Sequence, residues 1–425
     1  MALTKNIAFV LSLVSLMSFD TSAQQNILIH QPIAGDYAPC EPSIAINPNN
    51  PAEIVAGSVL NYVYTSADTG KTWITNSLTS KHGVYGDPCI IADDKNHFYY
   101  FHLSDPSGEG WENNALLDRI VCQRSNRKLT KWTKGSGIGL NHPKDQDKEW
   151  AAWDAINKRL VVTWTQFDKY GDESPTCESN IMLSTSKNGR KWTDPISISG
   201  IPGNCLDESE TVEGAVPAID NEGNILVAWS LNGKLFFNKI RFKNPASYEA
   251  KECVIVDQKA DWAFDIPGIG RANGMPITVF DKNSGNIYVN WADQRNGADD
   301  TDIWLIKSTD GGTTWSKHIR VNDDAPGKHQ FFTWMTVDQS TGFIYCVFYD
   351  RRNHNDTKTD VYLAISKDSG ETFENCKISE GPFEPSEDVF FGDYNNISAV
   401  NGVVRPVWTR NDSGKLSIWT AIVNK

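Results

Sequence analysis

The 425-residue sequence lacks several features that mark common protein classes. It has no excess of positive charge, because 40 Lys and Arg residues stand against 53 Asp and Glu residues, a formal net charge of -13. A phosphate backbone requires clustered positive charge, so this balance argues against a nucleic acid as partner. After residue 17 no segment is apolar enough to cross a bilayer, and membrane insertion is not expected. Cys-x-x-Cys pairs are also absent, which argues against zinc ribbons, and the sequence predicts no metal site and no cofactor.

The start of the chain has the features of a secretion signal. A basic residue is followed by an apolar run at residues 7–17, which is too short to span a bilayer, and small residues follow at 21–23. We therefore expect residues 1–23 to be a signal peptide and residues 24–425 to form a single exported domain, periplasmic or secreted.

All eight cysteines lie after the expected cleavage site, and an oxidising compartment would permit disulfides there. Cys177 and Cys205 occur in one repeat and are the expected pair. Cys346 lies within an apolar strand and is expected to stay a buried thiol. The other pairings stay open, because eight cysteines allow many connectivities.

One short pattern, S-x-D-x-G-x-T-(W/F), recurs along the chain. It occurs at residues 66–73, 308–315 and 366–373, and eroded copies end at Trp132 and Trp192. In such a turn the Asp accepts backbone hydrogen bonds, the Gly supplies a positive φ, and the aromatic ring packs the hairpin onto the core. The copies are about 60 residues apart, with one degenerate copy near residue 240, and a repeat of this length is typical of propellers and arrays.

Each repeat also contains the same series of short strand-like segments. The first segments of the seven repeats lie at residues 43–47, 88–92, 150–153, 216–219, 275–280, 332–337 and 395–400. A second segment follows a polar turn, a third precedes the Asp turn and a fourth follows the aromatic residue, with no helical periodicity between them. The sequence therefore predicts an all-β fold, a seven-bladed β-propeller of four-stranded antiparallel blades, with six blades as the alternative.

The two ends of the chain complement each other. The last repeat stops at residues 421–425 after its third segment, and a spare strand at residues 26–30 precedes the first repeat. Pairing of this N-terminal strand with the last blade would close the ring and remove the exposed sheet edges.

The repeated turns resemble the Asp-box (BNR) repeats of the sialidase-like β-propeller superfamily. The segments W-x-D-x-R at 291–295, F-Y-D-R-R at 348–352 and G-D-Y at 392–394 resemble those of its exported bacterial members. The resemblance extends over residues 24–425 and implies a propeller. Asp-boxes occur in enzymes and in binding proteins alike, so the resemblance implies little about chemistry.

Propeller topology separates the candidate functional residues from the structural ones. The Asp-boxes join third to fourth strands and lie on one face, whereas the loops between blades gather around the axis on the other, where ligands of propellers usually bind. We expect the Asp-box aspartates to be structural. The residues expected to be catalytic are His82, Tyr85, His329 and Tyr394. The residues expected to bind substrate are Glu149, Arg271, Arg295, Arg351, Arg352 and Asp393.

Arginine forks suit carboxylates and sulfates, so this set favours an acidic, uronate-containing oligosaccharide or polysaccharide as partner of a monomeric protein. The first hypothesis is a lyase or dehydratase. Arg271 and Arg352 would neutralise the carboxylate while His82 and Tyr394 transfer protons, which requires these four side chains to converge on one pocket.

Two other hypotheses remain. In a sialidase-like glycoside hydrolase, Arg271, Arg295 and Arg352 would form the arginine triad and Tyr394 would be the nucleophile. The first two repeats, however, contain no arginine before Arg119 to supply the early member of that triad. A propeller that binds glycans without catalysis is the third hypothesis.

Overall fold

A computed structural model describes residues 25–244, 247–259 and 261–423. The expected signal peptide at residues 1–23 lies outside the described residues. Within the described part of the chain, no helix is long and apolar enough to cross a membrane.

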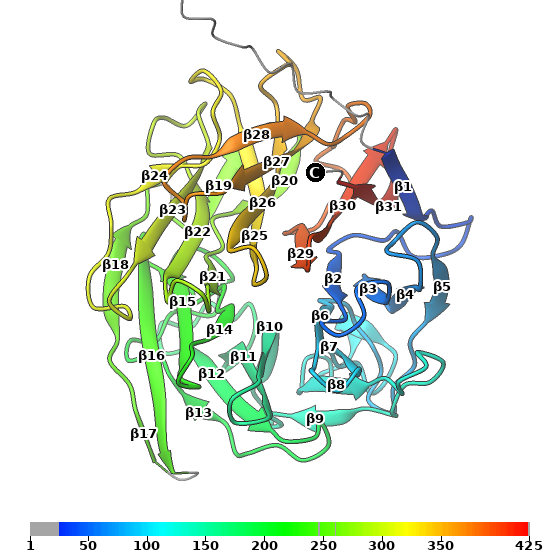
Figure 1. Cartoon of the computed structure of the whole chain (residues 1–425). Helices are drawn as coiled ribbons and strands as arrows, with labels where there is room; N and C mark the ends of the chain where they lie inside the picture. The colour runs from blue at the N-terminus through cyan, green and yellow to red at the C-terminus, as the bar shows by residue number, and fades with distance from the viewer. Residues whose placement is uncertain (1–24, 245–246, 260, 424–425) are drawn as a thin grey trace, which may run out of the picture.

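Seven antiparallel sheets stand around a central axis, which confirms the predicted seven-bladed β-propeller (Figure 1). The strands of blades one to three are β2 (Ser43–Ile46), β3 (Ile54–Ser58), β4 (Tyr62–Ser66), β5 (Ile74–Ser77), β6 (Cys89–Ala92), β7 (Phe98–Leu103), β8 (Ile120–Arg124), β9 (Ser136–Ile138), β10 (Asp145–Asp154), β11 (Arg159–Phe167), β12 (Ser179–Ser186) and β13 (Ile196–Ser197). A 3-10 turn, η1 (Gly110–Glu112), lies between β7 and β8.

Blade four is the irregular one, where the degenerate repeat was expected. Its strands are β14 (Pro217–Ile219), β15 (Ile225–Leu231), β16 (Lys234–Asn244), β17 (Ser247–Glu249) and β18 (Cys253–Asp257). Strand β16 is long enough to pair with β18 at one end and with β17 at the other. A separate hairpin of β19 (Ala263–Ile266) and β20 (Ile269–Asn273) follows before blade five.

The remaining blades are regular. Their strands are β21 (Ile277–Phe280), β22 (Ile287–Asp293), β23 (Asp302–Ser308), β24 (Ile319–Arg320), β25 (Gln330–Asp338), β26 (Phe343–Asp350), β27 (Asp360–Ser366), β28 (Glu374–Lys377), β29 (Asn396–Val400), β30 (Val403–Asp412) and β31 (Lys415–Ile422). The first strands of adjacent blades contact one another in a ring, so each blade begins at the axis and ends at the rim.

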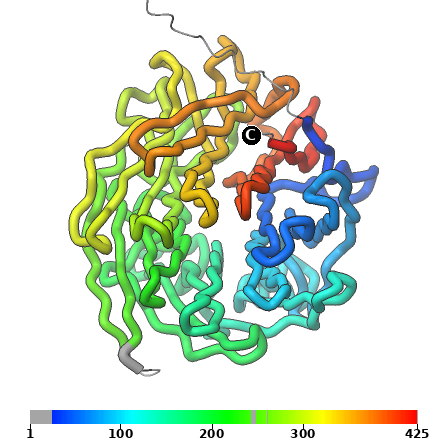
Figure 2. Tube along the Cα trace, in the orientation of Figure 1, coloured from blue at the N-terminus to red at the C-terminus, as the bar shows by residue number. Residues whose placement is uncertain are grey.

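The N-terminal strand closes the ring as predicted. Strand β1 (Gln25–His30) pairs antiparallel with β31, with Leu28 opposite Trp419, and becomes the outer strand of blade seven. Figure 2 shows the two ends of the chain side by side in this blade. The pairing satisfies the backbone groups that an open edge of β31 would expose.

The Asp-boxes form the expected turns between third and fourth strands. Asp310 Oδ1 accepts hydrogen bonds from the backbone N–H groups of Thr313 and Thr314, at 3.0 and 2.9 Å. In the eroded copies Asn126 and Asn188 take the place of the Asp as acceptor. These turns are therefore structural elements that fix each outer hairpin.

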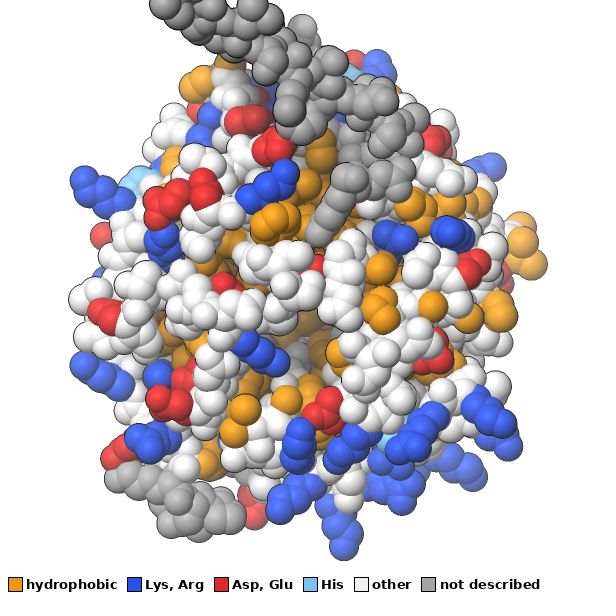
Figure 3. Space-filling view, in the orientation of Figure 1, with side chains coloured by type: hydrophobic (Ala, Val, Ile, Leu, Met, Phe, Trp, Pro, Cys, Tyr) orange, Lys and Arg blue, Asp and Glu red, His pale blue; other side chains and the backbone are white. Residues whose placement is uncertain are grey.

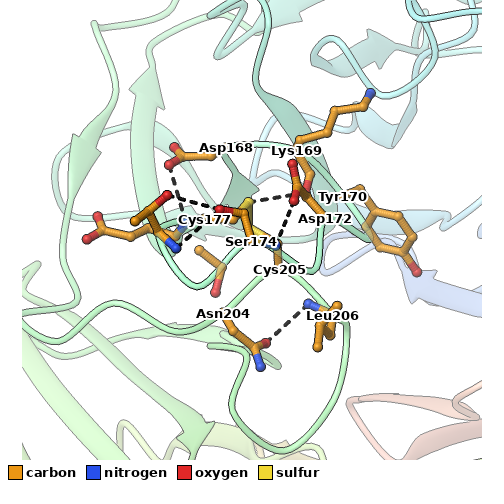
Figure 4. Close-up of a disulfide and its surroundings, with 12 residues drawn as sticks. Asp168, Lys169, Tyr170, Asp172, Ser174, Cys177, Asn204, Cys205 and Leu206 are labelled. Carbon is orange, nitrogen blue, oxygen red and sulfur yellow. Dashed lines mark hydrogen bonds between the residues drawn. A yellow bond between two sulfur atoms is a disulfide. The ribbon is translucent and has the colours of Figure 1, made fainter.

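The predicted disulfide between Cys177 and Cys205 is present, with their Cα atoms 5.8 Å apart, and Cys346 is a fully buried thiol as predicted. The bridge joins the β11–β12 loop to the β13–β14 loop, with Tyr170 beside it (Figure 4). These two loops also supply residues to the axial site described below.

Candidate active site

The innermost strands, together with the loops and the hairpin that lead into them, place ionisable side chains close together at the axis. We call the following residues the axial cluster: Glu41, Asp87, Asp147, Lys148, Glu149, Asp207, Glu213, Arg271 and Asp393. Carboxyl groups outnumber the two cations in this set. Within the described residues, no group of carboxylates, His and Cys has the arrangement of a metal site.

The backbone is strained where it delivers several of these side chains. Glu41, Asp87 and Lys148 have left-handed φ values of 53°, 48° and 50°, which non-glycine residues adopt at a cost on the order of 1–3 kcal/mol each. A β-bulge between Asp147 and Trp150 accompanies the turn at Lys148. Phe332 of blade six has the same left-handed φ, 50°, and a bulge at the equivalent place, so this kink belongs to the entry of the inner strand and directs the side chains before it towards the axis.

Asp393 pairs with both cations of the axial cluster, as Asp207 does at longer range from Lys148. Arg271 Nε donates to Asp393 Oδ1 at 2.9 Å, and Lys148 Nζ lies 3.4 Å from Oδ2. Burial alone would raise the pKa of Asp393, but Arg271 and Lys148 outweigh it and hold the pKa below its usual value. Asp393 is therefore ionised at neutral pH. Arg271 also donates to Asp207 at 2.9 Å, and its side chain is 40% exposed, so it lies between these carboxylates and solvent.

Glu149 has the opposite environment. It is 1% exposed, and neither of its carboxyl oxygens has a hydrogen-bond partner on another described residue. Burial, reinforced by Asp87 and Asp147, raises the pKa of Glu149 well above its usual range. Glu213 is equally buried and unpartnered among the described residues, and burial raises its pKa in the same way. Both groups are therefore protonated at neutral pH.

A small cavity brings the ionised and the protonated carboxyl group together. Its volume is about 10 Å³, which is room for about one water molecule. The residues that line it are Asp87, Lys148, Glu149, Trp150, Trp262, Asn273, Met275, Asp393 and Tyr394. The Tyr394 hydroxyl has no partner among the described residues, and its ring packs edge-on against Trp150, with the centroids 5.0 Å apart. Burial and the surrounding carboxylates raise the pKa of Tyr394 well above its usual value.

Aromatic rings extend the site away from the axis. The Tyr170 hydroxyl donates to Asp207 Oδ2 at 2.7 Å, and the Tyr170 ring lies 5.4 Å from that of Trp111, between centroids. Trp111 is 64% exposed and meets Tyr85 edge-on at 6.3 Å. We call Tyr85, Trp111 and Tyr170 the aromatic platform. Its hydrogen bond to Asp207 connects it to the axial cluster.

The structure gathers four of the residues expected from the sequence at the axis, namely Glu149, Arg271, Asp393 and Tyr394. Tyr85 lies nearby, in the aromatic platform. The two expected histidines are not members of the axial cluster. His82 Nε2 is buried and has no hydrogen-bond partner among the described residues, and burial together with Arg119 and Lys81 lowers the pKa of His82. His329 Nδ1 lies 3.0 Å from the Thr301 hydroxyl.

The expected arginine groupings do not form at the axis. Arg295 pairs with Asp293 two residues before it, and Arg352 pairs in the same way with Asp350. The D-x-R spacing lets each guanidinium fold back onto the carboxylate at the end of its own second strand. The predicted convergence of His82, Tyr394, Arg271 and Arg352 on one pocket is therefore wrong for His82 and Arg352.

Arg351 contacts the hairpin that carries Arg271. It donates to the carbonyl of Pro267 at 2.6 Å, and Gln294 donates to the carbonyl of Asp265 at 2.9 Å. Burial lowers the pKa of Arg351 to about 10. Strand β20 of this hairpin bears Arg271 and Asn273, so Arg351 helps to position the hairpin.

Sequence reasoning missed members of the cluster, above all Glu41 and Asp207. The sequence does contain a signal for two cluster members, Glu41 and Asp87. Glu41 and Asp87 each precede a proline and the first segment of a repeat, which is the place where the chain reaches the axis. No comparable pattern marks Asp207, which the fold brings to the cluster from a long loop.

Comparison with known proteins gives similarity in structure alone. No protein family and no curated protein matches the sequence. A protein of unknown function from Dyadobacter fermentans is 12% identical over 93% of this chain and 96% of its own, with a TM-score of 0.50. An α-L-arabinanase of Penicillium chrysogenum, solved with arabinobiose, is 12% identical over 94% of this chain and 98% of its own, with a TM-score of 0.49. A Hadza microbial sialidase is 13% identical over 87% of this chain and 73% of its own, with a TM-score of 0.47. At these identities the similarity concerns the fold alone.

Proposed function

We propose that the protein is a glycoside hydrolase in which Glu149 is the general acid and Asp393 the ionised carboxylate. One observation carries the proposal. Three carboxyl groups line a single cavity at the axis, and two of them, Glu149 and Asp393, have pKa values moved in opposite directions. Burial raises the pKa of the third, Asp87. Two carboxyl groups in different protonation states are what hydrolysis of a glycosidic bond requires.

In the proposed reaction, protonated Glu149 donates its proton to the glycosidic oxygen as the bond from that oxygen to the anomeric carbon breaks. Ionised Asp393, held by Arg271 and Lys148, stabilises the positive charge that develops on the sugar ring. Water supplies the hydroxyl that replaces the leaving group, and its second proton returns the acid to its starting state. The cavity between the two carboxyl groups is of the size of this water.

We infer a neutral sugar at the axis, in place of the acidic sugar expected from the sequence. Arg271 and Lys148 are already paired with Asp393 and Asp207, so neither offers an unpaired positive charge to a uronate. The exposed ring of Trp111 suits the apolar face of a pyranose or furanose. The aromatic platform would thus hold a second sugar unit next to the one that is cleaved.

The other two catalytic hypotheses have less support. The elimination hypothesis assigned proton transfer to His82 and carboxylate binding to Arg352. Both residues contact residues outside the axial cluster. A tyrosine nucleophile needs a lowered pKa, whereas that of Tyr394 is raised. Of the three arginines expected to form a sialidase triad, Arg271 alone lies in the cluster.

The test is product analysis on a panel of neutral and acidic oligosaccharides. We expect reducing sugar without the ultraviolet absorbance of an unsaturated product, and we expect Glu149→Gln to lower kcat by about 10²–10⁴-fold. Asp310→Asn in an Asp-box is the matched control and should retain the wild-type rate. An absorbing product would establish elimination instead, and binding without any product would establish a glycan-binding protein. Export of the protein remains part of the proposal and is tested by the N-terminal residue of the secreted product.

A further inference from the structure

The rim of blade two is basic, although the protein as a whole is acidic. Residues 119–144 contain seven Lys and Arg residues and no Asp or Glu, in a chain whose formal net charge is -13. Figure 3 shows Lys and Arg side chains gathered over β8 and β9. The net charge therefore hides a local excess of the opposite sign.

The basic side chains of this surface are exposed and have no acidic partner among the described residues. We call the following residues the basic rim: Lys81, Arg127, Lys128, Lys131, Lys134, Lys187, Arg190 and Lys191. All are exposed, and none forms an ion pair with a described residue. This distinguishes them from Arg271 in the axial cluster and from Arg295 and Arg352, whose charges are paired internally.

Two outer turns form this surface together. Lys81 donates its backbone N–H to the carbonyl of Lys134 at 3.0 Å, which fixes the loop after β5 against blade two. Ser136 of β9 bonds both to the carbonyl of Gly189 at 2.8 Å and to Trp192 Nε1 at 3.0 Å. These bonds hold the outer turn of blade three against blade two, so the cations of both turns lie on one continuous rim.

Open grooves lined by both polar and apolar side chains run beside these cations. A groove of about 610 Å³ between blades one and two is lined by Lys128 and Lys131 together with Asn76, Ser77 and Thr130. A second groove, of about 530 Å³, is lined by residues that include Lys187 and Lys191. Amide and hydroxyl groups beside cations suit a ligand that carries both hydroxyl groups and negative charges.

We propose that the basic rim binds an acidic polysaccharide, a linear sugar chain bearing carboxylates or sulfates. Lysine ammonium groups on flexible stems contact successive charges without a fixed register, and the grooves accept the hydroxyl-bearing sugar units between them. The acidic carbohydrate expected from the sequence thus binds at the rim and not at the axis. The inference is independent of the reaction proposed for the axial cluster.

An anionic lipid surface fits the basic rim less well. The two turns, residues 126–134 and 187–192, contain no exposed large apolar side chain for insertion into such a surface. The rings of Trp132 and Trp192 pack edge-on against Tyr100 and Phe101 and line the two grooves, where the apolar face of a sugar unit can pack against them.

The experiment measures binding of the full mature chain to immobilised polygalacturonate and dextran sulfate, with neutral dextran as reference. In the test variant Arg127, Lys128, Lys131 and Lys134 are changed to Gln, and in a second variant Lys187, Arg190 and Lys191 are changed to Gln. The matched control changes the exposed lysines Lys234, Lys251, Lys282 and Lys415 of other blades to Gln. The control removes the same net charge as the first variant.

We expect the first variant to weaken the Kd for both polyanions by about tenfold or more at low salt, and the second variant to weaken it as well. The control should stay within about twofold of the wild type, and binding should fall steeply as salt rises. Equal weakening in the control, or no binding by the wild-type protein, would overturn the proposal. Tighter binding to phosphatidylglycerol vesicles or to double-stranded DNA than to either polysaccharide would assign the rim to that partner instead.

Discussion

Replacing Glu149 with methionine distinguishes a catalytic role from a structural one. A residue kept for catalysis should be replaced with a gain in stability, and a structural residue with a loss. Methionine has a similar volume and no charge. A buried carboxyl group without hydrogen-bond partners costs about 1–3 kcal/mol of desolvation. Because both oxygens of Glu149 are in this state, Glu149→Met should increase the free energy of unfolding by about 1–3 kcal/mol. The same change removes the proposed proton donor, so kcat should fall by about 10²–10⁴-fold.

The stability gain should also depend on pH. The pKa of Glu149 is raised in the folded protein, so the unfolded chain releases the proton first as the pH rises. Wild-type stability therefore falls as the pH rises from the unfolded pKa, about 4.3, towards the folded pKa. The methionine variant lacks this dependence, and its advantage over the wild type should be larger at pH 8 than at pH 5.

Urea unfolding at several pH values, together with initial rates, measures both effects. The matched control is Asp154→Leu, at the C-terminal end of strand β10. Asp154 is also fully buried, but its carboxylate accepts hydrogen bonds from Asn157 and Arg159. This variant should be destabilised and should retain its turnover per folded molecule. If Glu149→Met proves less stable than the wild type at every pH, Glu149 is a structural residue and the reasoning is refuted.

Three further outcomes are expected. Trp111→Ala should raise KM by about tenfold and change kcat little, because the exposed ring is proposed to hold a sugar unit away from the reacting bond. Initial rates at several substrate concentrations measure both constants, and a fall in kcat alone would contradict this role. Hydrogen bonds from Thr314 lower the pKa of Asp310 to about 2, so the Asp-box stabilises the protein above about pH 4 and loses this contribution between pH 4 and 2. Asp310→Asn should therefore make the melting temperature depend less on pH in this range. An unchanged dependence would contradict the structural role of Asp310. Replacing Cys177 and Cys205 with Ser should lower the free energy of unfolding by about 3.5 kcal/mol, because the bridge closes a loop of sequence separation 28. Urea unfolding with and without reductant measures this difference, and equal stability of the wild type and the variant without reductant would contradict it.

The fold could be predicted from sequence because its determinants are local. Each Asp-box fixes one turn, each apolar segment fixes one inner strand, and the number of such segments gives the number of blades. Ring closure by the N-terminal strand followed from counting, since the last repeat has one strand too few.

The site could be predicted only in part, because its chemistry depends on how charges pair after folding. Arg271 and Arg352 look alike in sequence, yet one joins the axial cluster and the other closes onto Asp350 two residues before it. A D-x-R spacing at a strand end is a signal for such local pairing and argues against a role in substrate binding. Glu149 was expected to bind substrate, but its lack of partners, which suggests an acid, follows from burial by several blades at once.

The distribution of charge explains why net charge alone is a poor guide to partners here. Burial keeps Glu41, Glu149 and Glu213 protonated at neutral pH, so these axial groups add nothing to the field outside the molecule. The side chains of the basic rim are exposed and form no ion pair with a described residue, so those acids do not compensate their charge. We therefore expect a polyanion to meet a positive surface at the basic rim of a protein whose formal charge is -13. The axial face would then stay open to the neutral sugar of the proposed reaction.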